Sequence, residues 1–169
     1  ERIVNDLLLG QGSVAHSILP EESWAYNAGT KYPFDPNRAK QLLDEAGFKD
    51  SNGDGLREMP KISFKISSGN QAVSQYAQFI QNQLTEVGIP VEIESLEFQT
   101  MLQQLQRGQY QMTTGRWVGG NQDPIFLRDL FASSEIPSES RASRNRSRYS
   151  NAQVDDLLIK AINATDRAR

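Results

Sequence analysis

Three short stretches of the chain alternate apolar and polar residues, and each of them predicts a β-strand. They span residues 61–68, 89–93 and 110–117. Successive side chains of a strand point to opposite faces, so this alternation is typical of a strand with one buried face. Two longer stretches between them repeat apolar residues every three or four positions, which predicts amphipathic helices. Their apolar residues are Val73, Tyr76, Ala77, Ile80, Leu84 and Val87 in the first helix, and Phe98, Met101, Leu102 and Leu105 in the second.

The region 61–117 therefore has the order strand, helix, strand, helix, strand. This order predicts right-handed crossovers and a largely parallel core of sheet, so we assign the chain to the α/β class with a mixed sheet. The matched periods also predict one apolar set that is buried together between sheet and helix. The set is Ile62, Phe64, Ile66, Ile80, Leu84, Val91 and Ile93.

Helix start signals flank this core on both sides. Asp35-Pro36 and Asp123-Pro124 each combine an N-cap aspartate with a proline in the first helical turn. Proline is tolerated there because the backbone N–H groups of the first turn have no hydrogen-bond acceptor within the helix. Residues 3–8 carry apolar positions at helical spacing, and Ser150 or Asn151 caps a last predicted helix.

A candidate binding site follows the third predicted strand. Trp117 stands at the strand end, and Gly119 and Gly120 interrupt the strand because glycine adopts backbone angles that other residues avoid. Ligands of open α/β sheets bind outside the carboxyl ends of the strands, so an aromatic ring beside bare backbone can form a ligand shelf. The other interpretation is that Trp117 is a core or hinge residue and the glycines only make a turn, since most Trp side chains are largely buried.

Residues 50–58 contain a possible calcium loop. Asp50, Asn52 and Asp54, followed by Gly55, match the first half of such a loop, but its twelfth position is Lys61 where a bidentate Glu is needed. Acidic, glycine-rich tight turns are common, and we predict a turn without a tightly held calcium ion.

Two further features of the sequence allow more than one interpretation. Arg141, Arg144, Arg146 and Arg148 form a basic run within a polar stretch, which is either a solvated loop or an anion contact. The triplet that begins at Asn145 matches a glycosylation acceptor, a pattern that also arises by chance.

Composition narrows the possible functions. The chain has 169 residues, enough for one domain with a core, and its net charge of −3 argues against nucleic-acid binding. It contains no cysteine, which excludes disulfides and thiolate metal sites, and the single histidine, His16, cannot build a zinc site alone. Neither a phosphate-binding glycine loop nor a nucleophile elbow occurs, so we expect no catalytic residues, no metal site and no cofactor. No apolar run approaches the length of a membrane span.

Four stretches, taken in order, resemble the extracellular solute-binding proteins of family 5, the binding components of peptide, nickel and related ABC importers. They are YPFDPNRAKQLLDEAGFKDSNGDG at 32–55, VGIPVEIESLEFQTMLQQLQRGQYQM at 87–112, RWVGGNQDPIFLRDLF at 116–131 and RYSNAQVDDLLIKA at 148–161. The resemblance implies one lobe of a two-lobed, periplasmic-binding-protein-like fold that closes around a solute. Residues 1–169 would form a single lobe, the C-terminal ligand-binding lobe, and both chain ends look cut, so we expect a piece of a longer protein.

The same resemblance implies which residues contact the ligand. They are Trp117, Val118, Gly119, Gly120, Asn121 and Asp123. Peptide-binding members usually carry an aspartate at the place of Gly120, where it pairs with the free ammonium group of the peptide. Since Gly120 has no side chain to make this bond, an oligosaccharide, a metal chelate or another small organic solute is open beside an oligopeptide.

The function implied is capture of a small solute for an ABC importer, without enzyme activity. The partners would be the solute and, through the full-length protein, the membrane permease. The protein would be a monomer and either periplasmic or a cell-surface lipoprotein. The alternatives are a ligand-sensing or chaperone-like module with the same fold, and an uncharacterised α/β enzyme.

Overall fold

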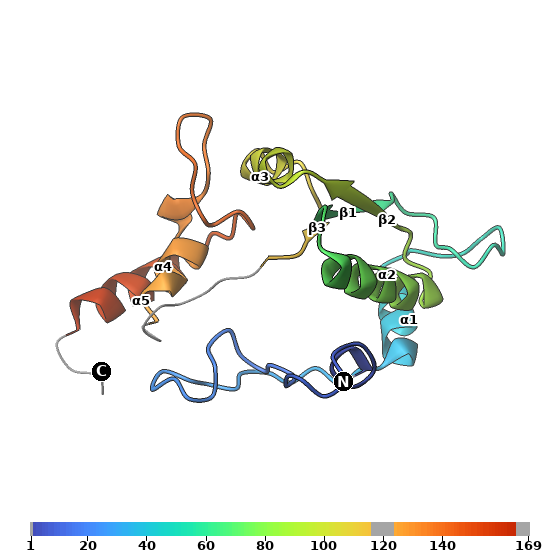
Figure 1. Ribbon diagram of the computed structural model, residues 1–169, viewed down its shortest axis with the longest axis horizontal. Helices are drawn as coiled ribbons and strands as arrows, with labels where there is room; N and C mark the ends of the chain where they lie inside the picture. Colours follow the sequence, from blue (N-terminus) through green and yellow to red (C-terminus); the bar gives the residue numbers. More distant parts are fainter. Residues whose placement is uncertain (1, 116–123, 165–169) are drawn as a thin grey trace. The chain divides into compact units, whose positions relative to one another are not determined.

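The computed structural model describes residues 2–115 and 124–164 of the chain (Figure 1). They divide into two compact units. The first unit comprises residues 1–18, 27–101 and 110–115, and the second comprises 19–26, 102–109 and 116–169. No helix in the described ranges is both long and apolar enough to cross a membrane.

A three-stranded parallel sheet forms the centre of the first unit. Its strands are β1 (Ile62–Ser67), β2 (Val91–Leu96) and β3 (Met112–Thr113), in the order β2-β1-β3. Phe64 of β1 is in register with Ile93 on one side and Met112 on the other. The predicted alternation of strands and helices and the parallel pairing are therefore confirmed.

The third strand is much shorter than predicted, because side chains replace backbone groups beside it. The Gln111 side-chain oxygen accepts the Ser63 N–H at 2.9 Å. Two residues further along both strands, the Thr113 hydroxyl donates to the Lys65 carbonyl at 2.9 Å. These bonds use backbone groups of β1 that a longer ladder would use. We predicted a strand that continues to Arg116 and Trp117; Thr114 and Gly115 are not part of the strand, so this prediction is wrong for them, and residues 116 and 117 lie outside the described residues.

The hydrophobic core lies between this sheet and helix α2 (Gln71–Glu86). Phe64, Ile66 and Ala77 are buried at its centre, and five partly buried residues pack against them: Val73, Ile80, Val91, Ile93 and Met112. The predicted set is thus largely confirmed, except that Ile62 and Leu84 are only half-buried and lie outside the cluster. Asn70 caps α2 by accepting the Val73 N–H at 3.1 Å.

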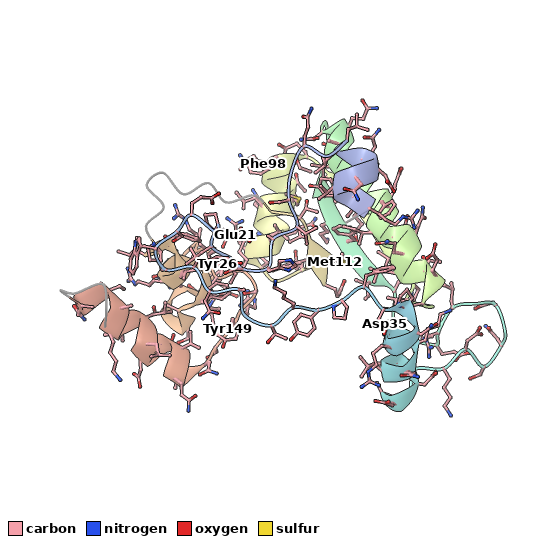
Figure 2. All side chains as sticks on the ribbon, turned by 90° about the horizontal axis from the view of Figure 1, so that it is seen from below. Glu21, Tyr26, Asp35, Phe98, Met112 and Tyr149 are labelled. Carbon is pink, nitrogen blue, oxygen red and sulfur yellow. The ribbon has the colours of Figure 1, made fainter. Side chains whose placement is uncertain are left out.

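Helix α1 (Pro36–Glu45) begins as predicted. The Asp35 carboxylate accepts the Arg38 N–H at 2.9 Å, and Pro36 occupies the first helical position. Figure 2 shows Asp35 at the start of α1 and Phe98 at the start of α3 (Phe98–Gln106). The described N-terminal residues form one π-helical turn, Ile3–Leu7.

Arg57 ties α1 to the end of α2. Its side chain is 9% exposed, and its nitrogens donate to the carbonyls of Lys40 and Val87 at 3.2 and 3.1 Å. It also pairs with Asp44 at 2.5 Å. The Val87 carbonyl is at the C-terminus of α2, where carbonyls carry partial negative charge, so the buried guanidinium is well placed beside it.

Among its described residues, the second unit contains the C-terminal part of α3, the helices α4 (Phe126–Phe131) and α5 (Ala152–Asn163), and the long segment that connects α4 to α5. Helix α4 begins later than predicted, and its N-cap position, Ile125, makes no side-chain cap; the predicted cap, Asp123, lies outside the described residues. A 3₁₀ turn (Ser133–Glu135) follows α4. Helix α5 is capped by Asn151, which accepts the N–H groups of Gln153 and Val154 at 2.9 and 3.3 Å.

Asn145 organises the connection between α4 and α5. It is 0% exposed, and its amide donates to the carbonyls of Ala132 and Tyr149 at 2.9 and 2.8 Å. Its oxygen accepts from the Ser147 hydroxyl and the Tyr149 N–H, each at 3.1 Å. Arg141, Arg144 and Arg148 are exposed, so the stretch is a surface loop, and Asn145 anchors it from within. A buried, fully bonded amide is not a glycosylation acceptor in the folded protein.

Candidate functional site

The carboxyl ends of the three strands meet at one edge of the sheet in the first unit. Ser68 follows β1, Glu97 follows β2, and Thr114 and Gly115 follow β3. A hydrogen bond of 2.7 Å from the Ser68 N–H to the Leu96 carbonyl holds the ends of β1 and β2 together. This is the edge at which open α/β folds bind ligands.

The polar side chains at this edge mostly serve the adjoining helices. Asn70 caps α2, and the Glu97 carboxylate accepts the N–H groups of Gln99 and Thr100 at 2.8 and 3.0 Å at the start of α3. These N–H groups, Gln99 first, hold the pKa of Glu97 below its usual value. The described part of the edge therefore offers backbone and hydroxyl groups to a ligand rather than unpaired carboxylates.

The predicted ligand-contacting residues continue from this edge. Trp117, Val118, Gly119, Gly120, Asn121 and Asp123 all lie in 116–123, outside the described residues. In the sequence they follow β3 and Gly115, the last described residue before this segment. Their assignment as ligand contacts stays a prediction.

An ion pair on the sheet, between a buried lysine and a partly exposed glutamate, was missed in the sequence. The Lys65 side chain is 10% exposed, and its ammonium lies 3.1 Å from the Glu94 carboxylate. The Ser63 hydroxyl donates to the other Glu94 oxygen. Alternation assigned these residues to a solvent face, but parallel sheets are commonly covered on both faces, and the opposite charges of Lys65 and Glu94 in register were the available signal.

This ion pair is sensitive to acid. The Ser63 hydroxyl and then the Lys65 ammonium hold the pKa of Glu94 below its ordinary value. A carboxylate with a lowered folded-state pKa contributes stability above its unfolded pKa, and that stability is lost as the pH falls through the folded pKa. The group therefore supports the fold at neutral pH and carries no sign of an acid or base poised for catalysis.

The acidic segment at 50–58 is a tight turn, as predicted. The Asp50 carboxylate accepts the N–H groups of Gly53 and Gly55 at 2.7 and 2.9 Å. Asp54 accepts the Leu56 N–H at 2.8 Å, and Gly53 and Gly55 have φ angles of 77° and 87°, which favour glycine. Carboxylates that bond to the backbone in this way stabilise the turn without a cation.

Removal of calcium is expected to leave the melting temperature of the protein unchanged. The reason is that backbone N–H groups already occupy the oxygens of Asp50 and Asp54. Differential scanning calorimetry with and without EDTA measures this. A loss of several degrees that calcium restores and magnesium does not would contradict the turn interpretation, because a tightly bound ion stabilises the folded state.

Arg141 and Arg144 of the basic run make ion pairs with described residues of the second unit. Arg144 pairs with Asp129 at 2.6 Å, and Arg141 lies 3.6 Å from Glu135. The Ser143 hydroxyl, followed by the charges of nearby arginines, holds the pKa of Glu135 below its usual value. His16, in contrast, is exposed.

Metal ligation finds no support in the described ranges, which contain no group of three His, Cys, Asp or Glu side chains placed to hold an ion.

Comparison with known proteins gives a consistent result. Residues 1–138 match the description "Bacterial extracellular solute-binding proteins, family 5 Middle". The chain is 33% identical over 179 residues to the oligopeptide-binding protein AppA of Bacillus subtilis, covering 99% of this chain and 31% of AppA. It is 30% identical to Heme-binding protein A of Haemophilus influenzae, covering 98% of this chain and 29% of that protein. The chain thus spans about a third of the length of these curated relatives.

Solved structures agree with the fold. The AppA structure from Bacillus subtilis in complex with a nonapeptide has a TM-score of 0.84 at 30% identity, covering 99% of this chain and 34% of AppA. The NikZ structure from Campylobacter jejuni in complex with Ni(L-His) has a TM-score of 0.82 at 26% identity, with 99% and 34% covered. These similarities confirm the predicted α/β class and binding-protein fold.

Proposed function

Because this chain belongs to the bacterial extracellular solute-binding proteins of family 5, we propose that it is part of the substrate-binding component of an ABC importer. The full-length protein captures a small solute in a cleft between two lobes and presents it to a membrane permease. The observation that carries this proposal is the family match over residues 1–138. The strand ends that converge at one sheet edge support it, because they suit one wall of such a cleft.

The chain itself is proposed to form the C-terminal ligand-binding lobe. Its coverage of 31% of AppA and 29% of Heme-binding protein A leaves room for a second lobe in the full-length protein. The protein acts as a monomer, and it is periplasmic or anchored at the cell surface as a lipoprotein. One relative is named a periplasmic protein, which supports the extracytoplasmic location.

The chemical class of the solute follows from position 120. The relatives' names and structures include an oligopeptide and heme as well as a nickel-histidine complex, so the family alone leaves the solute open. Gly120 cannot supply the carboxylate that a peptide ammonium needs. We therefore favour an oligosaccharide, a metal chelate or a similar solute without a free ammonium group over an oligopeptide. Mass spectrometry of small molecules that co-purify with the full-length protein identifies it.

Trp117→Ala is expected to weaken binding of that solute by about 1–3 kcal/mol, because the ring stacks on or packs against the ligand. Isothermal titration calorimetry on the full-length protein measures the loss. The melting temperature should hardly change, since a partly exposed ring contributes little to the core. A stability loss of about 3–5 kcal/mol would instead identify Trp117 as a core residue.

Gly120→Asp is expected to weaken binding or leave it unchanged, because a new carboxylate finds no ammonium partner on the proposed solute. The same calorimetric titration tests it, with Gly119→Asp as a control that places the charge one residue away. Markedly tighter binding in Gly120→Asp alone would point to a cationic solute and restore the peptide hypothesis.

Two other functions remain as alternatives. A sensing or chaperone-like module would bind a solute in the same way but pass it to no permease, so transport assays in a strain that lacks the protein separate it from an importer component. An α/β enzyme would need a nucleophile and a base within reach. The sequence carries no nucleophile motif and its single histidine is exposed, so we propose that the protein is not an enzyme.

A further inference from the structure

A groove of about 1010 Å³ lies within the second unit. The C-terminal part of α3 and Arg107 form one side, residues from the segment 137–142 form another, and Arg148 lines it as well. Glu139 is the acidic residue among those that line the groove. Nothing in the proposed solute-binding function uses it.

The two arginines in this groove lack the neutralising partners that other arginines of the unit have. Arg128 and Arg141 lie 3.7 and 3.6 Å from Glu135, and Arg144 lies 2.6 Å from Asp129. Within the described ranges, in contrast, neither Arg107 nor Arg148 comes within 4.0 Å of a carboxylate. Uncompensated positive charge is thus concentrated in a concave surface, where the local potential is strongest.

Arg148 is held in place before any ligand arrives. Its two terminal nitrogens donate to the carbonyls of Gln106 and Pro137 at 3.1 and 3.4 Å. The Arg148 backbone has a φ of 56°, which is uncommon for a residue other than glycine. The guanidinium also packs closely on Gly108: a Cβ at that position would lie 2.7 Å from the Arg148 Nε, so any other residue type would force the side chain to shift. The guanidinium therefore loses little conformational entropy on binding, and three of its five N–H groups remain for a ligand.

The opposite side of the groove is fixed as well. The Gln106 side chain accepts the Ser143 N–H at 3.1 Å and donates to the Ser143 carbonyl at 3.0 Å. The Ser143 hydroxyl in turn donates to Glu135 at 2.5 Å. These contacts anchor the segment 137–142 at its C-terminal end, so the groove has defined walls.

We propose that this groove is a binding site for a small multivalent anion that carries carboxylate or phosphate groups. A guanidinium matches the planar oxygens of these groups and forms short, charge-assisted hydrogen bonds with them. Arg148 supplies a fixed contact and Arg107 an adaptable one. The bonds from Arg148 also offset the partial negative charge at the end of α3, which would otherwise repel an anion.

Calorimetric titration of the intact protein with citrate and, separately, with inorganic phosphate tests this site. At about 10 mM ionic strength, where screening is weak, we expect saturable binding of at least one probe and weaker binding in added salt. If only citrate binds, the natural ligand carries carboxylate groups. If only phosphate binds, it carries phosphate groups.

Three variants assign the binding to the groove. Arg107→Gln is expected to weaken binding about fivefold, and Glu139→Gln to tighten it about twofold because a repulsive charge is removed. Lys40→Gln, which removes a positive charge from exposed α1, is the matched control and should leave binding unchanged. Since Arg107 is exposed, its replacement should not unfold the protein.

Two results would overturn the site. One is the absence of saturable binding of either probe tighter than about 10 mM. The other is an equal loss of affinity in Arg107→Gln and Lys40→Gln, which would show that only the total charge matters. In that case Arg107 and Arg148 merely complement the C-terminus of α3.

Discussion

The 169-residue chain alone is expected to bind the solute of the full-length protein several powers of ten more weakly than the full-length protein does. Our proposal places only one wall of the cleft on this chain, and each power of ten corresponds to about 1.4 kcal/mol of lost contact energy. A solute held between two lobes loses half of its contact surface when one lobe is removed. Calorimetric titration of both proteins with the solute identified by co-purification measures the difference.

The control for this comparison is the fold of the shorter chain. Circular dichroism and a cooperative thermal transition must show that the chain is folded under the conditions of the titration. Given a folded chain, equal affinity of the two proteins would refute the two-lobe account. It would also place the whole binding site within these 169 residues.

The central sheet could be predicted from the sequence because its signals are local. The alternation of Phe64 and Ile66 with polar neighbours, and the helical spacing of Ala77 and Ile80, depend only on the period of each element. Cap residues such as Asp35 likewise act within three residues of their own position. All these features agree with the observed structure.

The features that the sequence did not predict depend on contacts between segments that are distant in the chain. The third strand is short because the side chains of Gln111, just before it, and Thr113, at its end, bond to β1 where backbone groups were expected. The anchor of the arginine loop was not foreseen, because Asn145 bonds to carbonyls 13 residues before it and four residues after it. No periodicity marks such contacts, since they depend on how distant segments meet.

The candidate ligand site was predictable only through resemblance. The strand end, the glycines and the helix start gave a place for a ligand but left the role of Trp117 open between shelf and core. The choice of residues 117–121 and 123 stays a prediction, which the titrations described above test. For the groove lined by Arg107 and Arg148, the basic run was a partial signal, because it named Arg148 as a possible anion contact. It could not identify Arg107 or the segment 137–142, which only the fold brings to Arg148.

Phe64→Ala is expected to reduce the free energy of unfolding by about 3–5 kcal/mol, the range for removing a fully buried aromatic side chain. Phe64 is 0% exposed in the central strand, and the core around Ile66 and Ala77 packs against it. Both neighbouring strands pair with β1 at this position, so the sheet backbone cannot easily move to fill the cavity. Urea denaturation of the variant and the parent protein measures the loss.

Phe34→Ala provides the matched control for this variant, because it removes the same side chain from a position that is 70% exposed. We expect it to change the free energy of unfolding by less than about 0.5 kcal/mol. Similar losses in both variants would mean that β1 and α2 do not form the core of the first unit. A large loss in Phe64→Ala alone would show that the alternation read from residues 61–68 identifies the centre of the fold, since Phe64 and its strand neighbours Ile93 and Met112 then share one buried face.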